Sequence, residues 1–341
     1  MKTIKVVVIG GGLVGLSTAI CISESLPQCE VTVVSESFSP NTTGDVAAGC
    51  LIPHTYPDTP FEQQKKWFQE TFDHLFKIAN SAEGADAGIS LLTGWQVYKN
   101  PPEEAFPFWW DVVLGFRLMT PTEIAKFPCH KFGQTFTTLK CQSSLYLPWM
   151  EQRFKTNGGT VQTGKVESIW QLYGKYNIVV NCSGIGSREL IGDLSLYPVK
   201  GQVLEVHAPW IKHFIREGNG NTYIYPGITG TTLGGTRQKD DWTLSADAKI
   251  SKEILDRCCD LEPSLRGVSI IREKVGLRPT RSAIRLEKEI FSKNGQQLPV
   301  VHNYGHGGSG FSVHIGTAKQ ATRMVEELIP LVGQFNVMSK L

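Results

Sequence analysis

The chain has 341 residues, of which 41% are hydrophobic and 19% are charged, as in ordinary folded globular proteins. This length is sufficient for two lobes, and the net charge of only +2, with no basic run interleaved with aromatic residues, predicts no nucleic-acid partner. The eight cysteines show no CxxC spacing, which favours buried reduced thiols over a disulfide framework, and we expect no bound metal.

The first part of the chain predicts a βαβ unit. Its strand, glycine turn, helix and second strand are expected at residues 4–9, 10–15, 16–25 and 31–34. The uncharged stretch 6–23 could also be read as a signal peptide or a membrane anchor. The four glycines in its middle argue against both, so we expect no membrane association.

Gly10, Gly12 and Gly15 form a GxGxxG turn between the strand and the helix. In dinucleotide-binding folds the first glycine permits a tight turn, the second lets the backbone approach a pyrophosphate, and the third lets helix and strand pack closely. Glu36 lies 21 positions after Gly15 and would accept hydrogen bonds from the adenosine ribose, which disfavours NADP. The alternative is a glycine turn that binds nothing.

The rest of the chain predicts an α/β fold with a Rossmann-like lobe and a second lobe built on a mainly antiparallel sheet. Helices are expected at residues 61–79, 120–123, 145–155 and 248–259, with a final helix of about five turns that stops near Pro330. Strands are expected at 89–97, 112–117, 178–181 and 299–302, and in β-rich pieces over 197–289. The predicted nucleotide-binding domain comprises residues 1–60, 135–192 and 297–341, and the predicted substrate domain comprises 61–134 and 193–296.

A second glycine-rich turn favours FAD over NAD as the dinucleotide. Residues 300–318, VVHNYGHGGSGFSVHIGTA, place five glycines between a short strand and the final helix. The N-terminus of that helix would stabilise negative charge on a reduced flavin, whereas nicotinamide becomes neutral on reduction. The small residues 42–50 suit close contact with phosphate and an isoalloxazine ring, although they could also be a surface turn. The residues predicted to bind FAD are Gly10, Gly12, Leu13, Val14, Gly15, Glu36, Ser37, Thr43, Gly44, Ala48, Gly49, Cys50, Leu51, Val166, Cys182, Ser183, Gly184, Gly307, Gly308, Ser309, Gly310, Phe311 and Ser312.

These residues resemble the D-amino-acid oxidase family of flavoproteins. The 300–318 segment fits that family's signature, and the stretches DVAAGCLIPHTYPDTP, VVNCSGIGSREL, TYIYPG, LGGTRQ and VGLRP recur in the family's order. The resemblance implies FAD-dependent oxidation of a D-amino acid by hydride transfer from Cα to flavin N5, with oxygen reduced to hydrogen peroxide. Hydrolysis of the imino acid would then release ammonia and a 2-oxo acid, and no strong general base is needed.

The resemblance also implies a substrate site. Arg278 and Tyr223 match the residues that hold the α-carboxylate, and a guanidinium suits a carboxylate because it donates two parallel hydrogen bonds. Arg216 and Arg237 resemble the positions that hold a distal carboxylate in the members that oxidise D-aspartate. We therefore expect acidic substrates: D-aspartate, and also D-glutamate or N-methyl-D-aspartate. The alternative for Arg216 and Arg237 is a pair of solvated arginines on a hairpin.

Three more residues are predicted near the substrate. His54 and Tyr56 follow residues 42–50, the predicted flavin loop, and are candidates for polar contacts with the substrate side chain. A histidine there can equally be a packing residue. Ser309 is a candidate contact for the substrate amine, but no histidine and acid are spaced to make it a nucleophile.

Three alternative functions stay open from the sequence: a neutral D-amino-acid oxidase, an NAD-dependent dehydrogenase, and a catalytically silent nucleotide-binding protein. The last three residues, Ser339, Lys340 and Leu341, spell a peroxisomal import signal at the C-terminus, unless the match is a coincidence. We expect the peroxisomal import receptor as a partner and the peroxisomal matrix as the location, where peroxide is removed by catalase.

Overall fold

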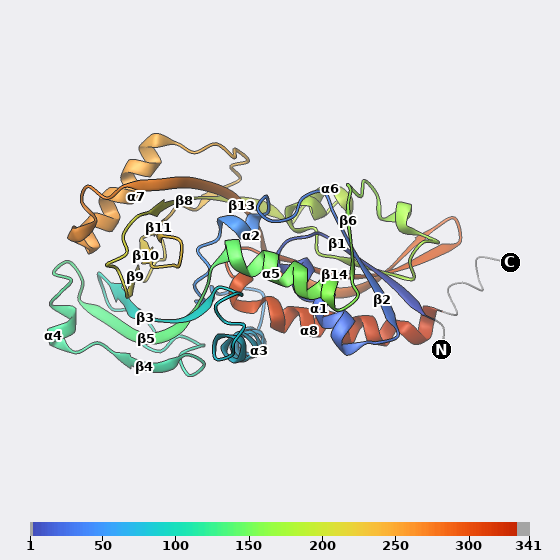
Figure 1. The fold of residues 1–341 in the computed structure, drawn as a ribbon, viewed down its shortest axis with the longest axis horizontal. Coiled ribbons are helices and arrows are strands. Elements are labelled where there is room, and N and C mark those ends of the chain that lie inside the picture. The colour runs from blue at the N-terminus through green and yellow to red at the C-terminus, as the bar shows by residue number, and fades with distance from the viewer. Residues whose placement is uncertain (1–2, 333–341) are drawn as a thin grey trace.

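The computed structural model describes residues 3–332, which form two lobes joined side by side (Figure 1). The strands are β1 (Ile4–Ile9), β2 (Cys29–Ser35), β3 (Ile89–Tyr98), β4 (Leu114–Leu118), β5 (Phe132–Cys141), β6 (Thr160–Thr163), β7 (Ile178–Asn181), β8 (Tyr197–Val206), β9 (Phe214–Glu217), β10 (Tyr223–Tyr225), β11 (Thr231–Gly234), β12 (Gln238–Lys239), β13 (Ile270–Lys293) and β14 (Gln296–His306). The α-helices are α1 (Leu13–Ser25), α2 (Thr43–Val46), α3 (Phe61–Ala79), α4 (Pro121–Ile124), α5 (Ser143–Thr156), α6 (Ser187–Leu190), α7 (Ala248–Leu261) and α8 (Gly310–Leu328). Short 3-10 helices lie at Ile169–Leu172, Gly184–Gly186, Pro263–Leu265 and Ile329–Leu331.

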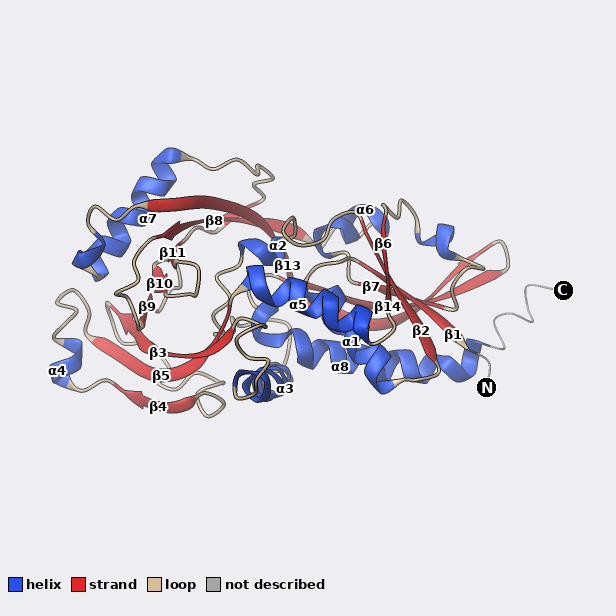
Figure 2. Ribbon diagram, viewed as in Figure 1, coloured by secondary structure: helices blue, strands red, loops and turns tan. Residues whose placement is uncertain are grey.

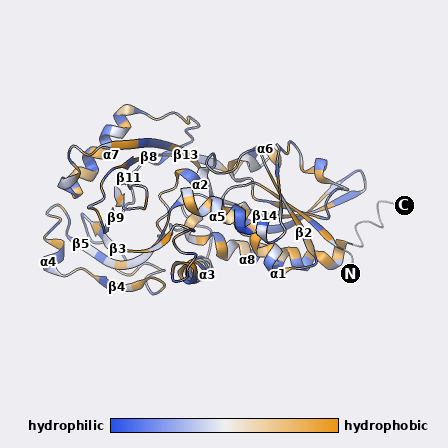
Figure 3. Cartoon of the chain, in the orientation of Figure 1, coloured by the Kyte–Doolittle hydropathy of each residue, from blue (hydrophilic) through white to orange (hydrophobic). Residues whose placement is uncertain are grey.

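The nucleotide-binding lobe is built on five neighbouring strands in the order β14-β7-β1-β2-β6, and every pair among them is parallel. β1 and β7 are buried along nearly their whole length, as expected for parallel strands with both faces covered. Figure 3 shows the hydrophobic colour in this part of the sheet, around the label of β2. Helices α1, α5 and α8 lie together against this part of the sheet (Figure 2). The predicted Rossmann-like lobe is therefore confirmed.

The second lobe has strands in the order β4-β5-β3-β9-β10-β11-β8, which are antiparallel except for the parallel pair β3–β9. The prediction of a mainly antiparallel second lobe is confirmed. Helix α7 covers this lobe at its outer side (Figure 1), and its buried Ile254 and Cys258 join the hydrophobic cluster of β8, β9 and β10.

One strand links the two lobes. The 24-residue β13 pairs with β8 over residues 270–280 and with β14 over residues 285–293, with a register shift between Thr280 and Arg285. The lobes therefore share one continuous sheet. The division into two discontinuous domains stays a prediction, and β13, which it assigns to the substrate domain, pairs with strands of both.

Several element boundaries differ from those expected. Helix α1 begins at Leu13, three residues earlier than predicted, because Gly12 already occupies the N-cap position and Gly15 lies inside the helix. The strand expected at 112–117 is β4, and the one expected at 299–302 is the longer β14, which gains length by pairing with β13. Gly316 packs α8 against α3, because a Cβ there would lie 2.4 Å from the Cα of Trp67.

All eight cysteines are free thiols: four are buried, three are half-buried and Cys129 is exposed. Among residues 3–332, no helix combines the length and the apolar character that a membrane crossing requires.

Candidate active site

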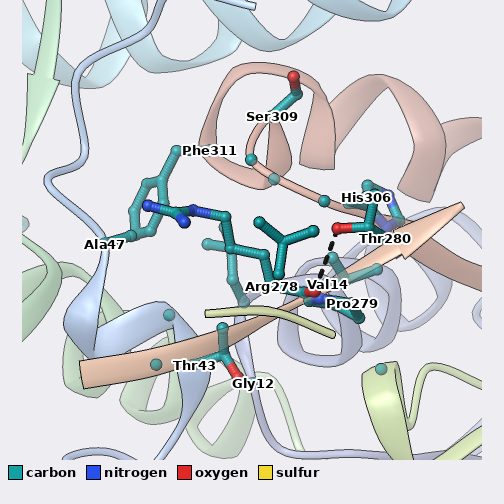
Figure 4. Close-up of a pocket in the computed structure, with 18 of the residues that line it drawn as sticks. Gly12, Val14, Thr43, Ala47, Arg278, Pro279, Thr280, His306, Ser309 and Phe311 are labelled. Carbon is teal, nitrogen blue, oxygen red and sulfur yellow. Dashed lines mark hydrogen bonds between the residues drawn. The ribbon is translucent and has the colours of Figure 1, made fainter. Parts of the chain in front are cut away.

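A cavity of about 790 Å³ lies between the lobes and collects residues from both. On the nucleotide-binding side its lining comes from the carboxyl ends of β1, β2 and β7, which is where ligands bind in open α/β sheets. The first turn of α8 and the inward-facing residues of β8, β10 and β13 complete it. Figure 4 shows Arg278 projecting from β13 into this cavity, with Ser309 and Phe311 of the α8 turn nearby.

The three glycines of the first turn have separate mechanical roles. Gly10 has a φ of +113°, and a Cβ there would lie 2.4 Å from the carbonyl oxygen of Cys182. A Cβ at Gly15 would lie 1.9 Å from the Gly10 carbonyl oxygen, so Gly15 permits the close packing of α1 on the turn. Gly12 faces open space, with only Thr42 within 4 Å, and leaves room for a ligand at the N-terminus of α1.

The loop after α2 presents unpaired backbone donors to the cavity. Gly49 has a φ of +68° and packs directly on Cys141, because its carbonyl oxygen accepts from the Cys141 N–H at 2.8 Å. The amide N–H groups of Ala48, Gly49 and Cys50 donate to no acceptor among residues 3–332, and all three residues line the cavity. Buried backbone donors are rarely left without partners, so this loop fits a ligand with acceptor atoms.

The second glycine turn places the N-terminus of α8 at the cavity. Gly307 has a φ of +51°, and Ser309 is the N-cap residue. The N–H groups of Gly310 and Phe311 have no acceptor among the described residues, so the positive end of the helix dipole faces the cavity. The glycine cradle, the free donors and these two helix N-termini together fit FAD.

The substrate side of the cavity holds three arginines. A Cβ on Gly220 would lie 2.7 Å from a terminal nitrogen of both Arg216 and Arg237, so the two guanidinium groups converge beside this glycine. A Cβ on Gly201 would lie 2.3 Å from the Arg278 guanidinium, so Gly201 provides the space that Arg278 occupies. Tyr223 stacks on Tyr225 with ring centroids 4.6 Å apart.

No acid among residues 3–332 neutralises these arginines. Within the described part of the chain, Arg216, Arg237 and Arg278 form no salt bridge with a carboxylate. Arg216 is only 6% exposed and donates to the Gln96 side-chain oxygen, while Arg278 donates to the Thr236 carbonyl oxygen at 2.9 Å. Burial and then its two arginine neighbours lower the pKa of Arg237. The site is therefore a pocket of positive charge, with Arg216 buried, Arg278 half-buried and Arg237 exposed, and it favours an anion.

His54 lies against this pocket. The Arg237 guanidinium approaches its Nε2 at 3.1 Å. Burial first, then the three arginines, lower the pKa of His54 well below its ordinary value, so the imidazole is neutral at physiological pH and can accept this hydrogen bond.

Tyr56 and Ser309 line the cavity but their hydroxyl groups are bonded within the protein. The Tyr56 hydroxyl donates to the His306 carbonyl oxygen at 2.7 Å, and the Ser309 Oγ accepts from the His54 N–H at 2.8 Å. Both bonds join the segment after the flavin loop to the α8 turn. Their predicted contacts with the substrate stay predictions.

The structure brings nearly all of the predicted site residues to this one cavity. The exceptions are Gly15, Leu51 and Val166, which do not line it. Leu51 is fully buried, with its N–H bonded to the Leu139 carbonyl oxygen, and Val166 packs against the hydrophobic cluster on the outer side of β7.

Lining residues that the sequence analysis missed include Gly11, Asn41, Tyr197, Gly201, Gly220, Tyr225, Thr236, Pro279, Thr280 and Arg281. Tyr225 could have been found, because strand alternation places it on the same face as Tyr223, two residues earlier. The positions of Gly201 and Thr236 in the site depend on the pairing of β8 with β13, which the sequence does not reveal.

Comparison with known proteins agrees with this geometry. A family model described as FAD dependent oxidoreductase matches residues 5–324. The chain is 60% identical to the D-aspartate oxidase of Homo sapiens over 96% of both chains, and 34% identical to the D-amino acid oxidase of Dugesia ryukyuensis over 95% of this chain and 98% of that one. The solved glycine oxidase of Geobacillus kaustophilus shares the fold, with a TM-score of 0.75 at 18% identity over 96% of this chain and 98% of that one. The chain therefore belongs to the FAD-dependent oxidoreductase family that contains the D-amino-acid and D-aspartate oxidases.

Proposed function

We propose that this protein oxidises acidic D-amino acids, with D-aspartate as the preferred substrate, to the 2-oxo acid, ammonia and hydrogen peroxide. The observation that carries the proposal is the convergence of Arg216 and Arg237 at Gly220, without an acidic partner, in the same cavity as Arg278. A neutral substrate would leave the buried Arg216 guanidinium without a counter-charge, whereas a second carboxylate would pair with Arg216 and with the more exposed Arg237. The human relative named D-aspartate oxidase supports the same choice.

The three arginines divide the binding of the substrate between two carboxylates. Arg278 binds the α-carboxylate with the Tyr223 hydroxyl as a second donor, and Arg216 and Arg237 bind the distal carboxylate. Because both ends of the substrate are held, its Cα is fixed in position, and positioning can supply much of the rate enhancement. Burial raises the pKa of Tyr223, so the phenol stays protonated and can donate.

When bound, FAD would supply the two-electron oxidation of the substrate, with oxygen as the final acceptor and peroxide as the product. The residues that would hold it are the first glycine turn, Glu36 at the end of β2, the loop at Ala48–Cys50 and the α8 turn. The positive end of the α8 dipole favours the extra negative charge of the reduced ring.

The lining contains no carboxylate beside Arg278 that could act as a base. Glu36, at the end of β2, is the one acid among the described lining residues. His54 is neutral but already accepts from Arg237. The described lining thus offers the substrate amine no carboxylate base, which agrees with catalysis by orientation and electrostatics.

Peroxide release from a panel of D-amino acids tests the proposal. Purified protein should be yellow and should turn over D-aspartate, D-glutamate and N-methyl-D-aspartate with far higher kcat/KM than D-alanine or D-methionine. A preference for the neutral substrates would make it a neutral D-amino-acid oxidase. Protein without flavin absorbance that reduces NAD would make it a dehydrogenase, and flavin-containing protein that releases no peroxide would make it catalytically silent.

We also propose import into the peroxisomal matrix through the receptor that recognises Ser339, Lys340 and Leu341. These residues lie outside the described part of the chain, so the support is the match of the sequence and the chemistry of the product. The full chain with an N-terminal fluorescent tag should coincide with catalase in cells, and removal of the last three residues should leave it in the cytosol. Identical distributions of the two forms would contradict the proposal.

A further inference from the structure

Lys140, on β5, is a buried lysine without an acidic partner in the described part of the chain. Its residue is only 4% exposed, and its Nζ donates to the Ala48 carbonyl oxygen and lies 3.4 Å from the Cys141 carbonyl oxygen. No carboxylate of the described chain lies within 4 Å of this ammonium. The neighbouring acid, Glu205, is already paired with Lys274 at 3.0 Å. Lysines are almost never fully buried unless they are paired, so Lys140 needs an explanation.

The peptide that Lys140 contacts belongs to the flavin loop. The Ala48–Gly49 bond is trans, so its carbonyl oxygen and the Gly49 N–H point in opposite directions. Because the oxygen faces the Lys140 ammonium, the Gly49 N–H faces away from it. Ala48 and Gly49 both line the cavity, and the Gly49 N–H has no acceptor among residues 3–332. A cation on the carbonyl side polarises the peptide and makes its N–H a stronger donor.

The charge of Lys140 is unfavourable for the fold itself. Burial lowers the pKa of Lys140 to about 8, which shows that its surroundings disfavour the ammonium form. An apolar residue of similar size would avoid this desolvation penalty. A purely structural role for the charge is therefore hard to reconcile with its position.

We infer that Lys140 is a positioning residue for the cofactor: its ammonium holds the Ala48 carbonyl and thereby aims and strengthens the Gly49 N–H as a donor to the flavin. A stronger donor favours the more electron-rich, reduced form. The inference rests on FAD as the bound group and is independent of which amino acid is the substrate. Lys140 does not line the cavity itself, so it acts through the peptide.

The reduction potential of the bound FAD, measured without substrate by equilibration with a reference dye, tests the inference. In Lys140→Met the equilibrium constant between reduced and oxidised bound FAD should change about tenfold in favour of the oxidised form. This is a shift of the reduction potential by about 30 mV to a more negative value. The visible spectrum of the flavin should shift and the Kd for FAD should rise, while the thermal unfolding temperature of the apoprotein should stay the same or increase. Lys140→Arg should restore most of the potential.

Lys200→Met is the matched control. Lys200 is also a buried lysine, but it lies 3.4 Å from Asp241. Its strand neighbours Val199 and Gly201 line the cavity, so its side chain points to the opposite face. Its loss should leave the potential unchanged.

An unchanged potential in Lys140→Met would overturn the inference, as would an equal shift in Lys200→Met. Should Lys140→Met yield no folded protein, Lys140→Gln keeps a hydrogen-bond donor without the charge and should show the same direction of shift. Failure of both variants to give folded apoprotein would also overturn it, because the inference expects the charge to be dispensable for folding. The potential is read without substrate, so failure of the proposed substrate preference leaves this test intact.

Discussion

Replacement of Arg216 by methionine should separate acidic from neutral substrates. Methionine keeps the length of the side chain but removes the charge and the donors. Because Arg216 is 6% exposed and has no acidic partner in the described chain, a bound distal carboxylate would form a desolvated ion pair with it. Breaking such a pair by removal of one partner costs about 3 kcal/mol or more, so kcat/KM for D-aspartate should fall at least about 100-fold.

The same substitution should spare neutral substrates. D-methionine brings no second carboxylate, so its kcat/KM should stay within a few fold of wild type or rise because a desolvated cation is gone. Steady-state peroxide release with both substrates measures the ratio of kcat/KM for D-aspartate to kcat/KM for D-methionine. Arg237→Met is the companion variant, and its loss on D-aspartate should be smaller because the Arg237 side chain is more exposed to solvent. Equal losses on D-aspartate and D-methionine in Arg216→Met would refute the two-carboxylate arrangement.

Three further predictions concern the rest of the site. Arg278→Met should reduce kcat/KM by about 100-fold or more on every D-amino acid, because each carries the α-carboxylate; a selective loss on acidic substrates, seen in the same peroxide assay, would contradict this role. Gly15→Ala should abolish FAD binding or folding, since its Cβ would lie 1.9 Å from the Gly10 carbonyl oxygen, and fluorescence titration with FAD after purification would show it; wild-type affinity would be the contrary result. The lowered pKa of His54 means that the unfolded chain takes up a proton below about pH 6.5 that the folded chain does not, so stability is lost as pH falls. Denaturant unfolding should therefore show a steeper loss below that pH for wild type than for His54→Gln, and parallel curves would exclude the effect.

Local features of the site could be predicted from the sequence, and features that depend on strand pairing could not. The roles of Gly10, Gly12 and Gly15 follow from a single strand–turn–helix, whose geometry is set by neighbours in the chain. By contrast, the space that Gly201 provides for Arg278 exists only because β8 and β13 pair in the observed register. No pattern within either segment reveals that contact.

Side-chain direction was a second limit on prediction. Leu51 follows Cys50 in the flavin loop, but the bridge between Cys50 and Lys140 turns Cys50 toward the cavity and leaves Leu51 in the core. Lys140 itself carries no signal in the sequence, because a lysine in a strand is ordinarily a solvated residue. The buried environment of Lys140 arises because β5 packs against the loop at residues 48–50.

The continuous β13 has a mechanical consequence for turnover. Rotation of one lobe against the other would have to bend this strand near residues 281–284, between its ladder with β8 and its regular ladder with β14. The distance between the arginines and the α8 turn is therefore held by backbone hydrogen bonds rather than by a flexible linker. We therefore expect substrate and product to exchange mainly through rearrangement of surface loops, with the two lobes moving together.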